Sequence, residues 1–306
     1  MPANILVVSF REEDIKFAKR LAKDNQLTVQ HCVTKEELRN SLTQSSHSIV
    51  LLEADLEHVY MEMGKILSKY MGPTRIFVLT DKPYEHYPHL FRVPYFGHHF
   101  IRRFGDEAVH MGSMILRAAL SKQTEGIAQY FPPQTKVARV QLNRSFDKAV
   151  AVQAIQNHLT RAGIKGRLAA LVSQSTDELI LNALFRAPNH PRPKHSDFQL
   201  NDKGKIEVEH AATQDYMGIS VVDHYGSLRR KTILETLRKH YELSSSGTRR
   251  VDEHTRLGIY GISKAGFSLL FTCRPRAATE VMLFFPRTEN HRQFLASFRF
   301  FSLFMT

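Results

Sequence analysis

Short, almost continuously apolar runs alternate with amphipathic stretches along the first 122 residues of the chain. A short apolar run predicts a buried strand, and apolar residues spaced three and four positions apart predict a helix. The predicted strands span residues 5–10, 27–32, 48–53, 75–80 and 98–101, and the predicted helices begin at Glu12, Lys35, Val59 and Asp106. Strands that are apolar on both faces are typical of a parallel sheet covered by helices on both sides. The pattern therefore predicts a five-stranded parallel α/β domain over residues 1–122.

The pattern breaks at residues 123–135, which are mostly polar and contain Pro132 and Pro133. Such a stretch favours neither a helix nor an inner strand, so it predicts a linker. Beyond the linker, residues 136–306 predict a second α/β domain with a mixed sheet. Its predicted strands include residues 137–142, 205–210 and 218–223, and its predicted helices include one that opens at Ser145 and one from Arg167 to Arg186.

The composition permits two globular domains, because 42% of the 306 residues are apolar and only 24% are charged. No apolar run is long enough for a membrane span, and the apolar N-terminus turns acidic at Glu12, which argues against a signal peptide. We therefore expect a cytoplasmic protein. Cys32 and Cys273 lie far apart and outside any metal-ligand spacing, so both are predicted to be core thiols.

The net charge of +12 is concentrated in the C-terminal half. Residues 1–122 carry 16 Lys/Arg against 14 Asp/Glu, which leaves +10 for the remaining residues. A basic half suits nucleic acid, an acidic protein, an anionic membrane surface or a nucleotide phosphate, and a solvated basic surface explains it equally. Because no nucleic-acid-binding motif accompanies the charge, nucleic acid is not the favoured partner.

The helix predicted from Arg167 to Arg186 carries Glu178 and Asn182 one turn apart on the same face. A carboxylate can orient or deprotonate an attacking group, and an amide oxygen one turn later can ligate the magnesium of a bound triphosphate. A helix that simply has a polar face explains the same pair. The features that follow it in the chain favour the chemical interpretation.

These features come in a fixed order: the apolar run ISVV ending in Asp223, then Gly226, the stretch RLGIYGISKAG with Gly258 and Gly261, and a predicted closing hairpin with Thr279. Together with the preceding helix, this order resembles the nucleotide site of the GHKL ATPase superfamily, which includes sensor histidine kinases and anti-sigma-factor serine kinases. The resemblance covers about 150 residues and implies an α/β sandwich that binds ATP and Mg²⁺.

The resemblance also implies a role for each residue. Glu178 would be the general base, Asn182 the magnesium ligand and Asp223 the acceptor for the adenine amino group; Gly226, Gly258 and Gly261 would let the backbone approach the nucleotide, and Thr279 would support the phosphate site. The glycines expected two and four residues after Asp223 are here Tyr225 and Ser227, so the glycine pair is lost. Arg249, Arg250 and Arg256 fall where the family has a lid over the phosphates.

The first 122 residues resemble the response-regulator receiver fold, a flavodoxin-like arrangement. In that family a phosphoacceptor Asp ends the third strand, a Ser or Thr ends the fourth and a Lys ends the fifth. Here Glu53 ends the third predicted strand and Thr80 ends the fourth, while Arg102 and Arg103 stand near the place of the Lys. Glu53 would be a pseudo-phosphoacceptor, either a fixed negative charge or a polar residue at a strand end. The resemblance implies a pseudo-receiver that binds partners without being phosphorylated.

Two aromatic segments complete the pattern. Residues 82–103 combine aromatic residues, Arg and four histidines, His86, His89, His98 and His99, which favours a protein-contact surface over a metal site. The C-terminal segment FLASFRFFSLFMT is rich in Phe, which favours core packing or domain docking over membrane insertion.

The functional hypothesis is a signal-transduction regulator in which a pseudo-receiver is coupled to an ATPase-like module. Its partners would be signalling proteins, including a second copy bound through the receiver-like domain, and its cofactors would be ATP and Mg²⁺. The enzymatic version is a serine/threonine protein kinase of the anti-sigma-factor type. Histidine autokinase activity is disfavoured, because His158 lacks a helical hairpin with a following acid. A non-enzymatic adaptor without nucleotide binding and a basic nucleic-acid-binding regulator are the alternatives.

Overall fold

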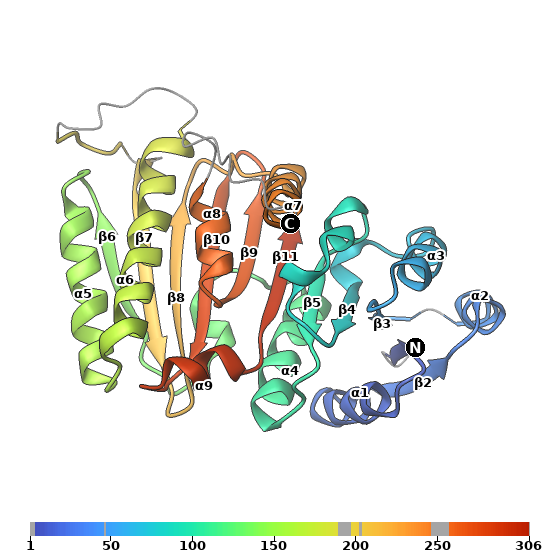
Figure 1. Ribbon diagram of the computed structural model, residues 1–306. Coiled ribbons are helices and arrows are strands. Elements are labelled where there is room, and N and C mark those ends of the chain that lie inside the picture. The colour runs from blue at the N-terminus through green and yellow to red at the C-terminus, as the bar shows by residue number, and fades with distance from the viewer. Residues whose placement is uncertain (1–3, 46, 189–196, 202–203, 246–256, 306) are drawn as a thin grey trace. The chain divides into compact units, whose positions relative to one another are not determined.

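The computed structural model describes residues 4–45, 47–188, 197–201, 204–245 and 257–305, and these form two compact units (Figure 1). Unit 1 comprises residues 1–124 together with 298–304, and unit 2 comprises residues 125–297 together with 305–306. The division near residue 124 lies close to the expected boundary. Residues 298–304, which were assigned to the second domain, belong instead to unit 1.

Unit 1 contains a parallel sheet flanked by helices. Its strand order is β2-β1-β3-β4-β5-β11, in which the first five strands are parallel and β11 is antiparallel to β5. The helices α1 and α4 pack together on one face of the sheet, and α2 and α3 lie on the other (Figure 1). The strands are β1 (Asn4–Val8), β2 (Thr28–Cys32), β3 (Ile49–Glu53), β4 (Ile76–Thr80), β5 (His98–Ile101) and β11 (Phe300–Met305), and the helices are α1 (Glu12–Asn25), α2 (Lys35–Gln44), α3 (Glu57–Leu67) and α4 (Asp106–Ser121).

The local sequence explains these elements. Every residue of β3 and β4 is buried, as their unbroken apolar runs predict for strands covered on both faces. The acidic residues Glu12 and Glu13 occupy the first turn of α1, where the helix dipole favours negative charge. Thr34 and Glu37 form a capping box that fixes the start of α2.

The aromatic segment before β5 is core, so the prediction of a contact surface there is wrong. Tyr84, Phe91, Phe96, His98 and His99 are all at most 4% exposed. The C-terminal strand β11 closes over them, and the Phe301 ring packs against Tyr84, Phe91 and Phe96. Core packing of the C-terminal segment is therefore confirmed.

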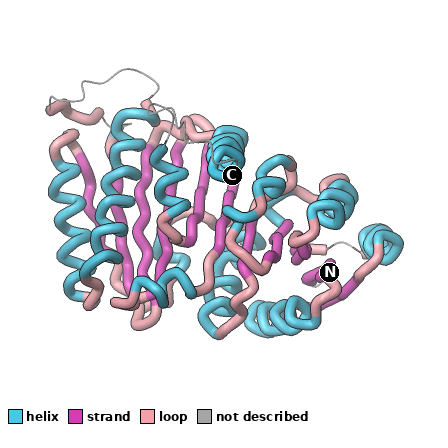
Figure 2. Tube along the Cα trace, in the orientation of Figure 1, coloured by secondary structure: helices cyan, strands magenta, loops and turns pink. Residues whose placement is uncertain are grey.

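Unit 2 contains an antiparallel sheet, so the chain as a whole is an α/β protein with parallel and antiparallel strands. The strand order is β9-β10-β8-β7-β6, and the four neighbouring pairs are all antiparallel. The helices α5, α6 and α8 cover one face of this sheet (Figures 1 and 2). The strands are β6 (Ala138–Leu142), β7 (Ile206–Ala212), β8 (Tyr216–Asp223), β9 (Ser268–Arg274) and β10 (Ala278–Pro286), and the helices are α5 (Asp147–Arg161), α6 (Gly166–Leu181), α7 (Arg230–Ser245), α8 (Leu257–Lys264) and α9 (His291–Ala296).

Both cysteines are buried and free, as predicted for core thiols. Within the described part of the chain, none of the helices has the length and apolar character that crossing a membrane requires. The same residues bring no three His, Cys, Asp or Glu side chains together in a way that could hold a metal ion.

Residues 125–131, expected to be linker, are part of the core of unit 2. A 3₁₀ turn, Ile127–Tyr130, packs on the sheet face opposite to the helices, and Gly218 of β8 leaves the space that the Phe131 ring fills. The Tyr216 hydroxyl donates to the Tyr130 carbonyl oxygen at 2.9 Å. The prolines that follow do not separate two domains, because the chain already contacts unit 2 before reaching them.

Replacing Phe131 by Ala should destabilise the protein by about 3–5 kcal/mol, because Phe131 is buried among Gly218, Tyr216 and Phe284 and its removal leaves a cavity. Urea unfolding of the full chain measures this change. The exposed neighbour Ala128→Ser is the control and should change the free energy of unfolding by less than about 0.5 kcal/mol. Equal small effects at both positions would contradict a packed segment.

Candidate functional site

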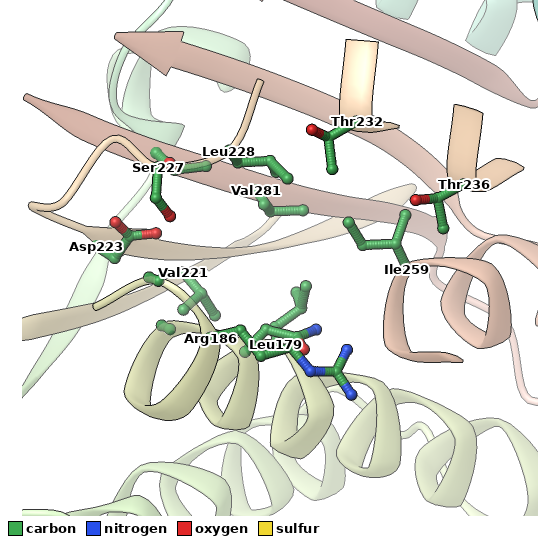
Figure 3. A pocket seen from close by; sticks show the side chains of 14 residues that line it. Leu179, Arg186, Val221, Asp223, Ser227, Leu228, Thr232, Thr236, Ile259 and Val281 are labelled. Carbon is green, nitrogen blue, oxygen red and sulfur yellow. The ribbon is translucent and has the colours of Figure 1, made fainter. Parts of the chain in front are cut away.

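The candidate site is a pocket between the sheet of unit 2 and the helices that cover it. The empty space, including solvent at the mouth, is about 850 Å³. Asp223 and Ser227 lie at one end of the pocket, and Thr236 and Ile259 lie at the other (Figure 3). The lining residues are Leu179, Asn182, Ala183, Arg186, Ala187, Val221, Asp223, Ser227, Leu228, Thr232, Thr236, Ile259, Thr279 and Val281. The mixture of apolar and polar groups is typical of a small-molecule site.

Asp223 ends β8 on the floor of the pocket. Its Oδ1 accepts hydrogen bonds from the backbone N–H groups of Tyr225 at 2.9 Å and Gly226 at 3.3 Å. Burial raises the pKa of this carboxyl to about 6, although those two bonds and the neighbouring His224 act in the opposite direction. Asp223 is thus a carboxylate at neutral pH, fixed by its own turn and poised to accept a hydrogen bond from a ligand.

Thr279 lies beside Asp223. The two residues are directly opposite in the antiparallel register of β8 and β10, and both are buried. The expected role of Thr279 was support of the phosphate site, but this register groups it with the residue assigned to the base. Val221 and Val281 are also register partners and extend the same floor with apolar surface.

Asn182 lines the opposite wall. It stands where α6 gives way to a π-helical turn, Asn182–Arg186, whose carbonyl at Asn182 accepts from Ala187 N–H. Wide turns of this kind often occur at functional sites, because they change the direction of side chains within a helix. Both polar atoms of the Asn182 amide are buried and have no hydrogen-bond partner among the described residues. An amide left in this condition fits a ligand that supplies the missing bonds.

Glu178 is one turn before Asn182, as predicted, but it does not line the pocket. Its Oε1 lies 3.8 Å from the guanidinium of Arg186. Burial raises the pKa of Glu178, and the charge of Arg186 opposes that shift. The carboxylate faces α8, where Gly258 approaches it closely.

Two of the three predicted glycines, Gly226 and Gly258, serve packing. Gly226 has a φ of 57°, and a Cβ there would meet the backbone of the β9–β10 turn within 2.2 Å of the Arg274 oxygen. Gly258 and Gly261 are residues of the helix α8, although the sequence predicted a glycine turn before a helix. None of the three lines the pocket. The predicted lid residues Arg249, Arg250 and Arg256 lie outside the described residues.

Four polar side chains of the pocket are not predicted from the sequence: Arg186, Ser227, Thr232 and Thr236. Arg186 is the positively charged residue among the described residues that line the pocket. The hydroxyl groups of Thr232 and Thr236 come from α7, and that of Ser227 comes from the turn before α7. The four-residue spacing of Asn182 with Arg186, and of Thr232 with Thr236, was the available signal, since residues four apart share a helix face.

At the carboxyl end of the parallel sheet in unit 1, Glu53 is fully engaged within the chain. Its carboxylate accepts from Ser9 Oγ at 3.0 Å, from Phe10 N–H at 3.1 Å and from Arg11 Nε at 3.1 Å. Thr80 is buried, and its hydroxyl donates to the Lys82 carbonyl at 2.6 Å and contacts His99 Nε2 at 2.6 Å. The Thr80 hydroxyl is therefore already hydrogen-bonded within unit 1.

Arg102, at the end of β5, connects the acidic residues of this face. Its Nε and Nη2 donate to Asp14 at 2.7 and 2.9 Å, and its Nη1 binds Asp55 and also Asp81. The Arg102 side chain is only 2% exposed, and Asp14 is fully buried. Burial alone would lower the pKa of Arg102, but the bonds to Asp14 and Asp55 raise it. A buried arginine thus neutralises carboxylates from the first turn of α1 and from the loops that follow β3 and β4.

Comparison with models of known protein families gave no match for this chain, and no curated protein matches it.

The raised pKa of Asp223 predicts a pH dependence of stability. The pKa of the Asp223 carboxyl is about 6 in the folded protein, and its ordinary pKa is 3.8. Between these two pH values the carboxyl is therefore protonated in the folded protein and ionised in the unfolded protein. The contribution of Asp223 to the free energy of unfolding therefore falls as pH rises from about 4 to about 6, by on the order of 3 kcal/mol. The difference between wild type and Asp223→Asn, measured by urea unfolding across this interval, should show the fall. Parallel curves for the two proteins would contradict it.

Removal of the Arg102 side chain should destabilise unit 1 strongly. In the Arg102→Ala variant, Asp14 is left buried without its charge partner, which costs about 3–5 kcal/mol. The adjacent Arg103 is exposed, so Arg103→Ala is the matched control and should cost less than about 1 kcal/mol. Unfolding followed by circular dichroism compares the two. A similar cost at both positions would show that the buried pairing with Asp14 is not what matters.

Proposed function

We propose that unit 2 is an adenine nucleotide-binding module of the GHKL type and that unit 1 is a receiver-like partner-binding domain, so that the chain works as a nucleotide-responsive signalling regulator. The observation that carries the proposal is the convergence of Asn182, Asp223 and Thr279 on one pocket, although almost one hundred positions separate the first from the last.

The floor of the pocket suits adenine. A carboxylate fixed by two backbone bonds can accept from the exocyclic amino group, and the apolar pair Val221 and Val281 can lie against the base. Thr279 adds a second polar group at the same end. We therefore assign the selectivity for adenine to this end of the pocket.

The side chains of the opposite wall offer the kind of ligand that a hydrated magnesium ion takes. Mg²⁺ takes oxygen ligands, and the Asn182 amide oxygen is buried without a partner among the described residues. The ion would neutralise the phosphates, and Arg186 would add one further positive charge to them. Asn182 would hold the metal through its side-chain oxygen, and Asp223 would orient the base.

The proposal is for binding and regulation, without phosphoryl transfer. Glu178, the expected general base, faces α8 and Arg186 and does not line the pocket. A non-enzymatic adaptor without nucleotide is the second candidate function, and the packing role of Gly226 favours it, because that glycine lies against the β9–β10 turn and does not line the pocket.

For unit 1, the internal pairing of its carboxylates supports a pseudo-receiver. A receiver that is phosphorylated needs carboxylates free to hold a metal ion. Here Arg102 binds Asp14 and Asp55, and Arg11 binds Glu53 and Asp81. We infer that this unit responds to partners through its surface, with signalling proteins or a second copy of the chain as the candidates.

Binding of ATP to the full chain, measured by calorimetry, should be saturable and should weaken at least about tenfold in Asp223→Asn. Because the Oδ1 position is held by two N–H donors, the new amide NH₂ must point to the pocket and would face the adenine amino donor. Glu280→Gln is the matched control. Glu280 is also a buried carboxyl of this sheet, but it bonds Ser220 and Gly126 and does not line the pocket.

In the same titrations, Asn182→Ala should abolish only the part of the affinity that depends on Mg²⁺ and should leave Mg-free ATP binding unchanged. The variant removes an amide that makes no bond within the described residues, so its stability should not fall as it would after loss of a hydrogen bond. Absence of any adenine nucleotide binding by the wild type would overturn the proposed function and leave the adaptor.

A further inference from the structure

A second cavity opens on the face of the unit 2 sheet that the helices α5, α6 and α8 do not cover. Its empty space, including solvent at the mouth, is about 470 Å³. The charged residues that line it are four glutamates and two arginines, Glu125, Glu207, Glu209, Glu280, Arg139 and Arg274. Four carboxylates against two guanidinium groups leave a net charge of −2, although residues 123–306 as a whole carry +10. The charge of the lining therefore favours a cation.

Three of the four carboxylates already have a cationic partner within the chain. Arg139 Nε donates to Glu209 at 2.7 Å, and Arg139 Nη1 lies 3.3 Å from Glu207 Oε2. Arg274 Nε lies 2.9 Å from Glu125 Oε1. These pairs neutralise the wall of the cavity only in part, because one guanidinium serves two carboxylates.

Glu280 is the carboxyl that has no cationic partner among the described residues. It is 4% exposed and accepts only from neutral donors, Ser220 Oγ at 2.6 Å and Gly126 N–H at 2.9 Å. Burial raises the pKa of Glu280 to about 7, and the charges of Glu209 and Glu125 act in the same direction. A buried carboxylate in this position lacks the positive charge that normally compensates burial, and a cationic ligand in the cavity would supply it.

The register of the sheet sets Glu280 in one row with a second carboxylate and an apolar side chain between them. Val222 of β8 is directly opposite Glu280 of β10 on one side and Glu207 of β7 on the other. Two strand spacings separate the backbones of the two glutamates by roughly 10 Å. Val222 is only half-buried and lines the cavity, so apolar surface lies between two carboxylates.

This arrangement suits two separated positive charges better than one metal ion. A metal ion needs its ligands around a single point, and the described residues bring no three His, Cys, Asp or Glu side chains together in that way. A ligand with an ammonium group at each end of a short methylene chain matches the row, since its methylenes can lie on Val222.

We propose that this cavity binds a small aliphatic diamine, with one ammonium group on Glu280, the methylene chain over Val222 and the second ammonium group on Glu207. The site is separate from the nucleotide pocket, because the two use opposite faces of the same strands β8 and β10. It would give the chain a second small-molecule input of opposite charge to the first.

Three probes of similar length test the role of the two charges in the wild-type protein. Calorimetry of the full chain with 1,4-diaminobutane should show saturable binding, butylamine should bind at least about tenfold more weakly, and 1,4-butanediol should not bind, because each ammonium group makes its own charge-assisted hydrogen bonds. Absence of diamine binding, or equal binding of the diol, would overturn the proposal. So would displacement of the diamine by Mg²⁺ at equal concentration, which would indicate a metal site.

The variant Glu280→Gln removes the inner charge and keeps the shape of the side chain. Its amide oxygen can accept from Gly126 N–H and its NH₂ can donate to Ser220 Oγ, so the protein should fold, which circular dichroism checks. Diamine affinity should fall at least about tenfold. The matched control is Asp223→Asn, a buried carboxyl on the opposite face of the same sheet, which should bind the diamine as the wild type does. Equal affinities in the two variants would overturn the assignment.

The variant Glu207→Gln tests the outer charge separately. It should lower the affinity for 1,4-diaminobutane to that for butylamine and should leave the affinity for butylamine unchanged, because a single ammonium group binds at Glu280. Equal losses for both probes would contradict the proposed orientation. ATP binding is measured on the same proteins, so a protein that binds the diamine and no nucleotide would refute the proposed function and support this site.

Discussion

The antiparallel register of β8 against β10 is the constraint on which the candidate site depends. It sets Asp223 opposite Thr279 and Val221 opposite Val281, all four on the pocket side of the sheet. The intervening residues point to the other face, where Glu280 accepts from Ser220 Oγ at 2.6 Å and from Gly126 N–H at 2.9 Å. Because side chains alternate along a strand, a slip of one residue would bring Glu280 into the pocket and remove Thr279 from it.

This register buries two carboxyl groups, Asp223 and Glu280, on opposite faces of one sheet. Their burial costs free energy, and a change of register would separate each carboxyl from the groups that bond it. Burial raises the pKa of Asp223 to about 6 and that of Glu280 to about 7, in each case against the hydrogen bonds that the carboxyl accepts. Each is satisfied by groups on its own face: the turn after β8 for Asp223, and Ser220 and residue 126 for Glu280. Packing of residues 125–131 on the sheet and formation of the pocket floor are therefore coupled through β8 and β10.

The sequence predicted the parts of the site that local patterns encode. The α/β class, the α6 helix with Glu178 and Asn182 on one face, and the apolar strand that ends at Asp223 all follow from periodicity within a few residues. Contacts between distant residues were not predictable in this way. Arg102 bonds Asp14 across 88 positions, and β11 completes the core of unit 1 from the other end of the chain. The segment before β5 shows the same limit: its aromatic residues suit a surface or a core equally, and only the presence of Phe301 decides that they are core.

The two units differ in how far the charges and hydrogen-bonding groups of their polar residues are satisfied within the chain. This difference bears on which unit can bind a charged ligand. In unit 1, Glu53, Asp55 and Asp14 already have cationic partners in Arg11 and Arg102, so a metal ion would have to displace a guanidinium. In unit 2, the amide of Asn182 is buried without a partner among the described residues, and the Asp223 carboxylate accepts hydrogen bonds from the backbone of its own turn. Satisfied charges stabilise a fold, and unsatisfied polar groups favour a ligand. The unsatisfied polar groups that a small ligand could satisfy therefore lie in unit 2, and the carboxylates at the strand ends of unit 1 are paired within the chain.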